Sequence, residues 1–166
     1  MRTALLMISI IAFCSSCKKE NGKAGENVEI YLLQTYQPIA GKCQVDPSRS
    51  SLDDGATITN ADILQYSRAT YQFKLSENAI QKVRAFHDYT PFAVTVDKDV
   101  IYFGIFKHGY SSSSCSQSIT MQVDWGAENK IYMGLGYPGL TQGITVDDQR
   151  NNSKLISSLE KQGKLN

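Results

Sequence analysis

The residues that could carry out chemistry gather around a short serine run in the second half of the chain. His108 stands three residues before Ser111–Ser114, and the acidic residues Asp97 and Asp99 lie upstream. A serine hydroxyl, a histidine base and an orienting carboxylate are the parts of a nucleophilic triad. No Gly-x-Ser-x-Gly elbow occurs, however, and a flexible polar loop explains the serines better. We therefore predict no catalytic residue, and we keep a serine hydrolase using Ser112 or a neighbour with His108 as an alternative.

The other polar groups predict neither a metal site nor a cofactor site. His87 and His108 are isolated, and no second histidine lies at the spacing that metal ligands share on a helix. The segment Gly134-Leu135-Gly136 lacks the third glycine and the following helix of a dinucleotide site. The acidic pairs Asp53-Asp54 and Asp147-Asp148 are adjacent residues, which suits turn and helix-cap roles.

The first sixteen residues, 1–16, predict a signal peptide. Ala4–Phe13 is an apolar run, shorter than the roughly 20 residues that span a bilayer but suited to a signal-peptide core. The run leads to Cys14-Ser15-Ser16-Cys17, which resembles the lipobox of bacterial lipoproteins, although Cys14 stands where an aliphatic residue is usual. This resemblance implies cleavage before Cys17 and diacylation of its sulfur. The alternative is ordinary secretory cleavage that leaves Cys17 as a free thiol.

The residues that follow indicate a tether. Residues 17–27 would form the lipid anchor and a flexible linker, because Lys18–Asn27 is polar, charged and contains glycine. In some Gram-negative bacteria an Asp directly after the acylated cysteine retains the protein at the inner membrane, so Lys18 favours the outer membrane. We expect membrane lipid to be a partner through acylated Cys17, with the domain of residues 28–166 in the cell envelope. No later stretch is apolar enough to cross a bilayer.

Two cysteines, Cys43 and Cys115, remain in this domain. An even pair in an oxidising compartment most simply forms one disulfide, so we predict that the two are bonded to each other. The alternative is two separate thiols, which Cα atoms more than about 7 Å apart would require.

Charge argues against a nucleic-acid partner. The chain has 17 basic and 16 acidic residues, and the signal peptide holds one basic residue, Arg2, and no acidic one. The mature chain would therefore carry equal numbers of each charge. A neutral, mixed surface offers a polyanion no electrostatic attraction. The remaining length suits a single domain with a hydrophobic core.

The middle of the chain predicts a strand, a helix and a hairpin. Arg68–Leu75 alternates apolar and polar residues, which is the pattern of a half-buried strand. Ser76 can cap a helix whose apolar residues recur at helical spacing as far as Tyr89. Phe92–Val96 and Val100–Lys107 then resume as strands around a turn, which predicts a hairpin. The helix should cover these strands as one α/β layer.

Four further elements flank this unit. Val28–Gln34 is rich in strand formers, Thr59–Tyr66 has the pattern of a short capped helix, and Ile119–Leu135 contains a second alternating hairpin. Val146–Gln162 predicts a final helix with a narrow apolar stripe.

Several of the nine tyrosines lie on predicted strands. An exposed row of tyrosines on a sheet would suit the binding of a partner, whereas half-buried packing is their commoner role. Tyr102 and Tyr132 are the first two to test for a part in binding.

Five segments together form a recognisable pattern. They are Val28-Glu29-Ile30-Tyr31-Leu32, Ile58-Thr59-Asn60-Ala61-Asp62, Tyr71–Ala79, Pro91–Ile101 and Leu155–Leu165. This pattern resembles the periplasmic P1 head subdomain of SecD and SecDF, accessory subunits of the bacterial Sec translocon. None of the segments is a catalytic signature.

The resemblance implies an α+β fold with a ferredoxin-like, mostly antiparallel sheet and two main helices on one face. The hairpin at Ile119–Leu135 departs from the family and would be an addition to that fold. In that family the head is thought to contact exported chains, which implies binding of an exported peptide or an envelope protein. The family's transmembrane helices are missing here, so we expect no proton pathway. Fold alone does not fix function. We expect a non-enzymatic, membrane-anchored envelope lipoprotein; the alternatives are an envelope serine hydrolase and a structural or inhibitory subunit of an envelope complex.

Overall fold

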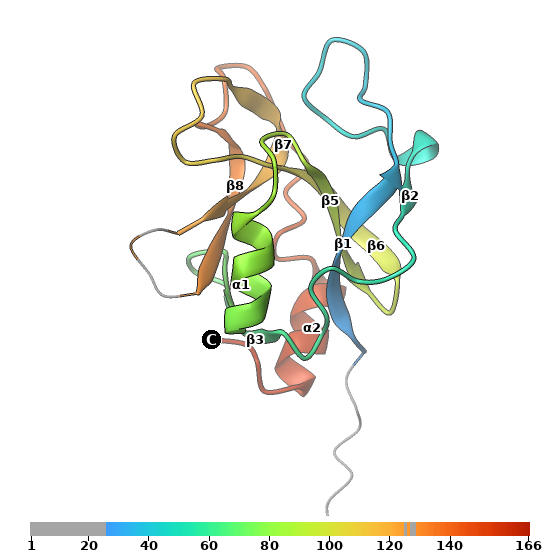
Figure 1. The fold of residues 1–166 in the computed structure, drawn as a ribbon, viewed down its shortest axis with the longest axis vertical. Helices are drawn as coiled ribbons and strands as arrows, with labels where there is room; N and C mark the ends of the chain where they lie inside the picture. The colour runs from blue at the N-terminus through green and yellow to red at the C-terminus, as the bar shows by residue number, and fades with distance from the viewer. Residues whose placement is uncertain (1–25, 125, 127–128) are drawn as a thin grey trace, which may run out of the picture.

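A single eight-stranded sheet and two helices make up the fold in the computed structural model, which describes residues 26–124, 126 and 129–166 (Figure 1). The predicted α+β class is confirmed. The strands are β1 (Val28–Thr35), β2 (Ser51–Leu52), β3 (Ile63–Ser67), β4 (Gln72–Leu75), β5 (Pro91–Val96), β6 (Asp99–Phe106), β7 (Cys115–Val123) and β8 (Lys130–Tyr137). The helices are α1 (Glu77–Arg84) and α2 (Ser153–Lys161), and a short 3-10 turn covers Pro47–Arg49.

The sheet consists of two antiparallel halves joined by one parallel pair. The strand order is β2-β1-β5-β6-β7-β8-β4-β3, and every neighbouring pair is antiparallel except β6 with β7. β6 and β7 pair at only three positions, from Gly104 opposite Ile119 to Phe106 opposite Met121. Parallel neighbours cannot be joined by a tight turn. The chain therefore has to double back between them, and residues 107–114 do this.

Both helices contribute to one hydrophobic core. Their buried residues belong to the same cluster as residues of the sheet, and they are Ala79, Ile80 and Val83 of α1 and Leu155, Ile156 and Leu159 of α2. In Figure 1, α1 lies across the sheet and α2 lies beside the start of β1. A smaller cluster contains Val45, Ile105, Cys115 and Tyr137. Because Ile105 alternates with Phe106 of the main core, the smaller cluster lies on the other face of β6.

Several predicted elements are confirmed. β1 matches the predicted first strand, and the hairpins β5–β6 and β7–β8 form where alternation predicted them. Asp97 and Lys98 turn the first hairpin with positive φ values of 49° and 69°, as a two-residue turn of this kind requires. The Ser76 hydroxyl caps α1 by accepting the Ala79 N–H at 3.2 Å.

The predicted short helix Thr59–Tyr66 is wrong, because its second half is strand β3. The Asp62 carboxylate accepts hydrogen bonds from the N–H and the hydroxyl of Thr59, which closes a turn. Ile63 and Tyr66 then enter the sheet, and both are fully buried. The capping groups are thus used for a turn that leads into a strand.

Three element boundaries differ from the prediction. β4 begins at Gln72 instead of Arg68, because Tyr71 has a positive φ of 55° and belongs to the turn before the strand. α1 ends at Arg84, after which Phe86 packs edge-on against Phe106 in the core. α2 begins after Asn152, whose side chain accepts the Lys154 N–H at 2.9 Å.

The sheet is larger than a ferredoxin-like sheet. The hairpin β7–β8, which we expected as an addition, lies inside the sheet, because β8 pairs with β4 as well as with β7. The last residues of the chain extend the far edge, where Tyr66 of β3 pairs with Leu165. The hairpin therefore holds β3 and β4 onto the rest of the molecule.

Candidate functional site

A cleft opens in the sheet where β6 and β7 separate. Its cavity has a volume of about 540 Å³, within the range of roughly 300–1,000 Å³ that small-ligand sites occupy. Val100–Phe103 of β6 form one wall, and Ser118 and Ile119 of β7 form the other. Because β7 pairs with β6 only from Gly104 onward, residues 99–103 of β6 have no strand partner on the β7 side.

The unpaired part of β6 directs main-chain groups toward the cleft. Successive residues of a strand turn their N–H and C=O groups to opposite sides. Phe106 donates its N–H to Thr90 on the β5 side. Lys107 donates its N–H to Met121 on the β7 side. Alternation back from Lys107 turns the N–H of Phe103 to the β7 side, one residue beyond the last paired position.

Two irregular segments close the cleft on its remaining sides. The loop between β1 and β2 contributes Gln44, Val45, Pro47 and Ser50. The segment before α2 contributes Val146, Asp147 and Gln149. Asp147 is the one charged residue in the lining that the described residues form. The cleft therefore combines apolar walls with neutral polar groups and a single negative charge.

Arg150 fixes the segment that carries Asp147 and Gln149. Its guanidinium binds both carboxylate oxygens of Asp148, at 2.8 and 2.7 Å, and donates to the Met133 carbonyl of β8 at 2.9 Å. The guanidinium carbon also lies 3.6 Å from the centre of the Tyr71 ring. The hydrogen bonds from Arg150 hold the pKa of Asp148 below its usual value. A buried arginine with three side-chain hydrogen bonds thus keeps this wall of the cleft in place.

Tyr102 belongs to the β6 wall of the cleft. Its side chain is buried, and its hydroxyl is the one buried side-chain polar atom without a hydrogen-bond partner among the described residues. Burial raises the pKa of the Tyr102 hydroxyl well above its usual value. Tyr102 therefore packs within the core, which is the packing role and not the exposed binding role that we considered for the tyrosines. Tyr132 on β8 is partly exposed.

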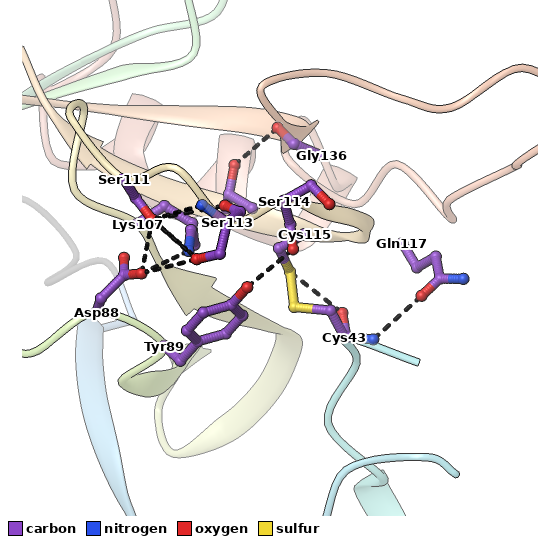
Figure 2. Close-up of a disulfide and its surroundings, with 11 residues drawn as sticks. Cys43, Asp88, Tyr89, Lys107, Ser111, Ser113, Ser114, Cys115, Gln117 and Gly136 are labelled. Atoms are coloured by element: carbon purple, nitrogen blue, oxygen red, sulfur yellow. Dashed lines mark hydrogen bonds and ion pairs between the residues drawn. A yellow bond between two sulfur atoms is a disulfide. The ribbon is translucent and has the colours of Figure 1, made fainter. Parts of the chain in front are cut away.

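The serine run lies beside a buried ion pair (Figure 2). Lys107 has a fully buried side chain, and its ammonium group donates to Asp88 at 2.6 Å. It also donates to the hydroxyls of Ser111 and Ser113, each at 3.1 Å. The centre of the Tyr89 ring lies 3.6 Å from the ammonium nitrogen of Lys107.

This arrangement suits a structural ion pair better than a nucleophile with its base. Burial favours a higher pKa for Asp88, but hydrogen bonds from Lys107, the His108 N–H and Ser111 outweigh it and lower the pKa. A lysine that serves as a base has to be neutral, and Lys107 instead shares its protons with a carboxylate and two hydroxyls. Ser111 in turn donates to Asp88 at 2.8 Å.

The groups of the alternative serine triad do not meet. The His108 ring stacks on Tyr110, with centroids 4.8 Å apart, and no hydrogen bond joins it to a serine in the described part of the chain. Asp97 accepts the N–H of Asn27, and Asp99 pairs with Lys154. Ser112 is exposed.

The predicted disulfide between Cys43 and Cys115 is confirmed, with Cα atoms 5.3 Å apart. It joins the loop between β1 and β2 to the start of β7 (Figure 2). The Cys43 N–H donates to the Gln117 side chain at 3.1 Å, which adds a second link to β7. The two residues after Cys43, Gln44 and Val45, line the cleft. The disulfide therefore positions one of its walls.

The remaining predicted residues have ordinary structural surroundings. Asp53 accepts the N–H of Asp54 in a bend, and Asp147 accepts from Gln149. Gly134-Leu135-Gly136 lies near the end of β8. His87 follows α1, and its carbonyl accepts the Thr90 N–H. Cys17, the predicted lipid attachment residue, lies outside the described residues, as do the signal peptide 1–16 and most of the linker 17–27.

The sequence did not identify Asp88, Lys107 or Arg150. A charged residue in an apolar run is a weak signal of a buried ion pair, and Lys107 directly after the apolar end of β6 is such a case. Nothing in the periodicity indicated that β6 and β7 would separate.

No known protein family, curated protein or solved structure matches the chain. Within the described ranges, no three His, Cys, Asp or Glu residues come together in a way that could hold a metal ion. In those same ranges, no helix has the length and apolar character needed to span a membrane.

Proposed function

We propose that this chain is a non-enzymatic lipoprotein of the cell envelope, anchored in the outer membrane by acylated Cys17, whose domain binds a protein or a peptide. The observation that carries the proposal is the cleft between β6 and β7, with its unpaired stretch of β6 at residues 99–103. A strand edge inside a sheet attracts polypeptide, because its main-chain groups need hydrogen-bond partners.

Two features support the envelope location. The bonded pair Cys43–Cys115 suits an oxidising compartment. The sequence Cys14-Ser15-Ser16-Cys17 after a short apolar run resembles a lipobox. We further propose that the five segments that resemble the SecD head reflect a structural relationship, within this larger sheet. The relationship would not extend to proton-driven export.

Mass spectrometry of the mature chain tests the anchor. The amino-terminal peptide should begin at Cys17 and carry a diacylglyceryl group, and the protein should sediment with membranes. A Cys17→Ala variant should lose both the lipid and the membrane association. An unmodified amino terminus in the native protein would overturn the anchor.

Crosslinking in intact envelopes tests the binding. The native protein should form one reproducible crosslink with a second polypeptide, and the crosslink should disappear when the domain is unfolded by reduction and denaturant. If no such polypeptide is recovered, the proposed binding function fails.

A further inference from the structure

We infer that the cleft takes its partner as an added β-strand: an extended segment of another protein that pairs with residues 99–103 of β6. This inference rests on the proposed function and specifies how the partner is bound. Strand addition to an open sheet edge is a general mode of peptide recognition, in which main-chain hydrogen bonds give affinity and pockets for alternate side chains give specificity.

The β6 backbone provides the first argument. Five residues of β6 precede the last paired position and lack a partner on the β7 side. At about 3.3 Å per residue they offer an edge of about 16 Å. The N–H of Phe103 faces this side, as alternation along the strand requires. An incoming strand would continue the ladder that ends at Gly104 and would fill the gap between the halves of the sheet.

The lining provides the second argument, because it selects the chemistry of the segment. Val100, Ile101 and Phe103 on β6 and Ile119 on β7 offer apolar contacts on both sides of an inserted strand. Asp147 is the one charged group of the lining in the described residues, and it would repel an acidic side chain. The segment should therefore alternate apolar with neutral or basic residues.

The edges of the sheet argue that the occupant is not the sheet of a second copy of this chain. β2, at one edge, has only two residues. β3, at the other, has part of its outer side covered, because the Tyr66 N–H donates to the Lys164 carbonyl and the Asn166 N–H donates to the Tyr66 carbonyl. Among the described residues, neither edge offers a free strand long enough to fill the cleft, so a segment from a different protein is the occupant.

Affinity selection with synthetic heptapeptides tests the inference. The library alternates Val, Ile, Phe or Tyr with Thr, Ser, Gln or Lys, and the full mature chain is the bait. The selected peptide should bind in calorimetry, and methylation of the backbone nitrogens along one edge should weaken it about tenfold for each lost hydrogen bond. On binding, the Phe103 amide should become protected from hydrogen exchange.

A matched pair of variants locates the binding. Val100 and Leu64 are both exposed apolar residues on strands, with 38% and 49% exposure, but only Val100 lines the cleft. Val100→Lys should weaken the peptide about tenfold or more, and Leu64→Lys should leave affinity within about twofold. No selected peptide, equal binding by the methylated peptide, or equal binding by Val100→Lys would each overturn strand addition.

The same variants separate this inference from the proposed function. If Val100→Lys still forms the native crosslink in envelopes, the protein binds a partner elsewhere and strand addition fails alone. If neither the native protein nor Leu64→Lys forms a crosslink, the binding function fails as well. Loss of the crosslink in Val100→Lys but not in Leu64→Lys supports both.

Discussion

At the residue scale, the stability of the domain depends on the buried ion pair of Lys107 and Asp88. The Lys107 side chain is 0% exposed and that of Asp88 is 28% exposed. Removal of one partner from a buried pair costs about 3–5 kcal/mol, because the other charge is left uncompensated. Asp88→Asn should therefore destabilise the domain more than Lys107→Met, since the lysine is the more deeply buried charge. Urea unfolding of both variants measures the two changes.

The double variant Asp88→Asn/Lys107→Met is the control for this prediction. It leaves no buried charge, so its loss of stability should be smaller than that of Asp88→Asn alone. A larger loss in Lys107→Met than in Asp88→Asn would show that the carboxylate, and not the ammonium, bears the cost of burial.

Tyr102 gives the opposite prediction at the same scale. Its buried hydroxyl has no hydrogen-bond partner among the described residues, and a buried unpaired polar group costs about 1–3 kcal/mol. Tyr102→Phe removes that cost and keeps the ring, so the free energy of unfolding should stay equal or rise by about 1 kcal/mol. Tyr66→Phe is the contrast, because it removes a hydroxyl that donates to the Arg150 carbonyl at 2.8 Å. Stability should fall in Tyr66→Phe only.

Single residues differed in how well the sequence predicted them. The Cys43–Cys115 bond followed from the number of cysteines and the compartment, which require no knowledge of the fold. Asp88 and Lys107 are 19 residues apart, on either side of a hairpin. Their meeting depends on how the chain returns after β6, and no local pattern records that.

At the element scale, Ser76 holds the start of α1 in two ways. Its hydroxyl accepts the Ala79 N–H and donates to the Asp62 carboxylate at 2.6 Å. Ser76→Ala should destabilise the domain by about 1–2 kcal/mol in chemical denaturation at neutral pH. Ser76→Thr, which keeps the hydroxyl, should lose much less.

The same contact predicts a dependence on pH. The hydrogen bond from Ser76 is the main cause of the lowered pKa of Asp62. A lowered folded-state pKa contributes stability above the unfolded value of about 3.9, and this contribution is lost as pH falls through the folded pKa. The difference between the native chain and Ser76→Ala should therefore shrink below about pH 4. A difference that stays constant down to pH 2 would contradict the role of Asp62.

The disulfide is the second element-scale prediction. It closes a span of 72 residues, which on the chain-entropy model stabilises by about 4 kcal/mol. Reduction should lower the free energy of unfolding by this order, measured in urea with and without reductant. A Cys43→Ser/Cys115→Ser variant should match the reduced protein and should not respond to reductant. Equal stability of the oxidised and reduced forms would show that the loop between β1 and β2 keeps its place without the disulfide.

Elements could be predicted where their periodicity was regular and their turns had clear chemistry. The hairpin β5–β6 is such a case, because Asp97-Lys98 suits its turn. The prediction failed at Thr59–Tyr66, since capping residues serve turns as well as helices. Tertiary burial of Ile63 and Tyr66 then decided in favour of a strand.

At the scale of the whole molecule, the sheet depends on one narrow connection. Three parallel pairs between β6 and β7 join its two antiparallel halves, and the cleft opens directly beside them. Strand order could not be predicted from periodicity, because alternation shows which face of a strand is buried but not which strand lies beside it. A strand added in the cleft would widen this connection, so binding of a peptide should raise the stability of the whole domain.

Gly104 offers a test of this connection. It lies opposite Phe92 on β5 and Ile119 on β7, and a Cβ atom there would lie 2.3 Å from the Phe92 ring and 2.8 Å from the Ile119 carbonyl oxygen. Gly104→Ala should therefore push β6 and β7 apart and destabilise the domain by about 1–3 kcal/mol. The amides of Lys107 and Met121 should exchange faster, while those of the β1–β5 pair should change less. Gly55→Ala is the control, because nothing lies within 4 Å of the added atom. Uniform acceleration across both halves would show that the sheet opens as one unit, with no weaker connection at β6 and β7.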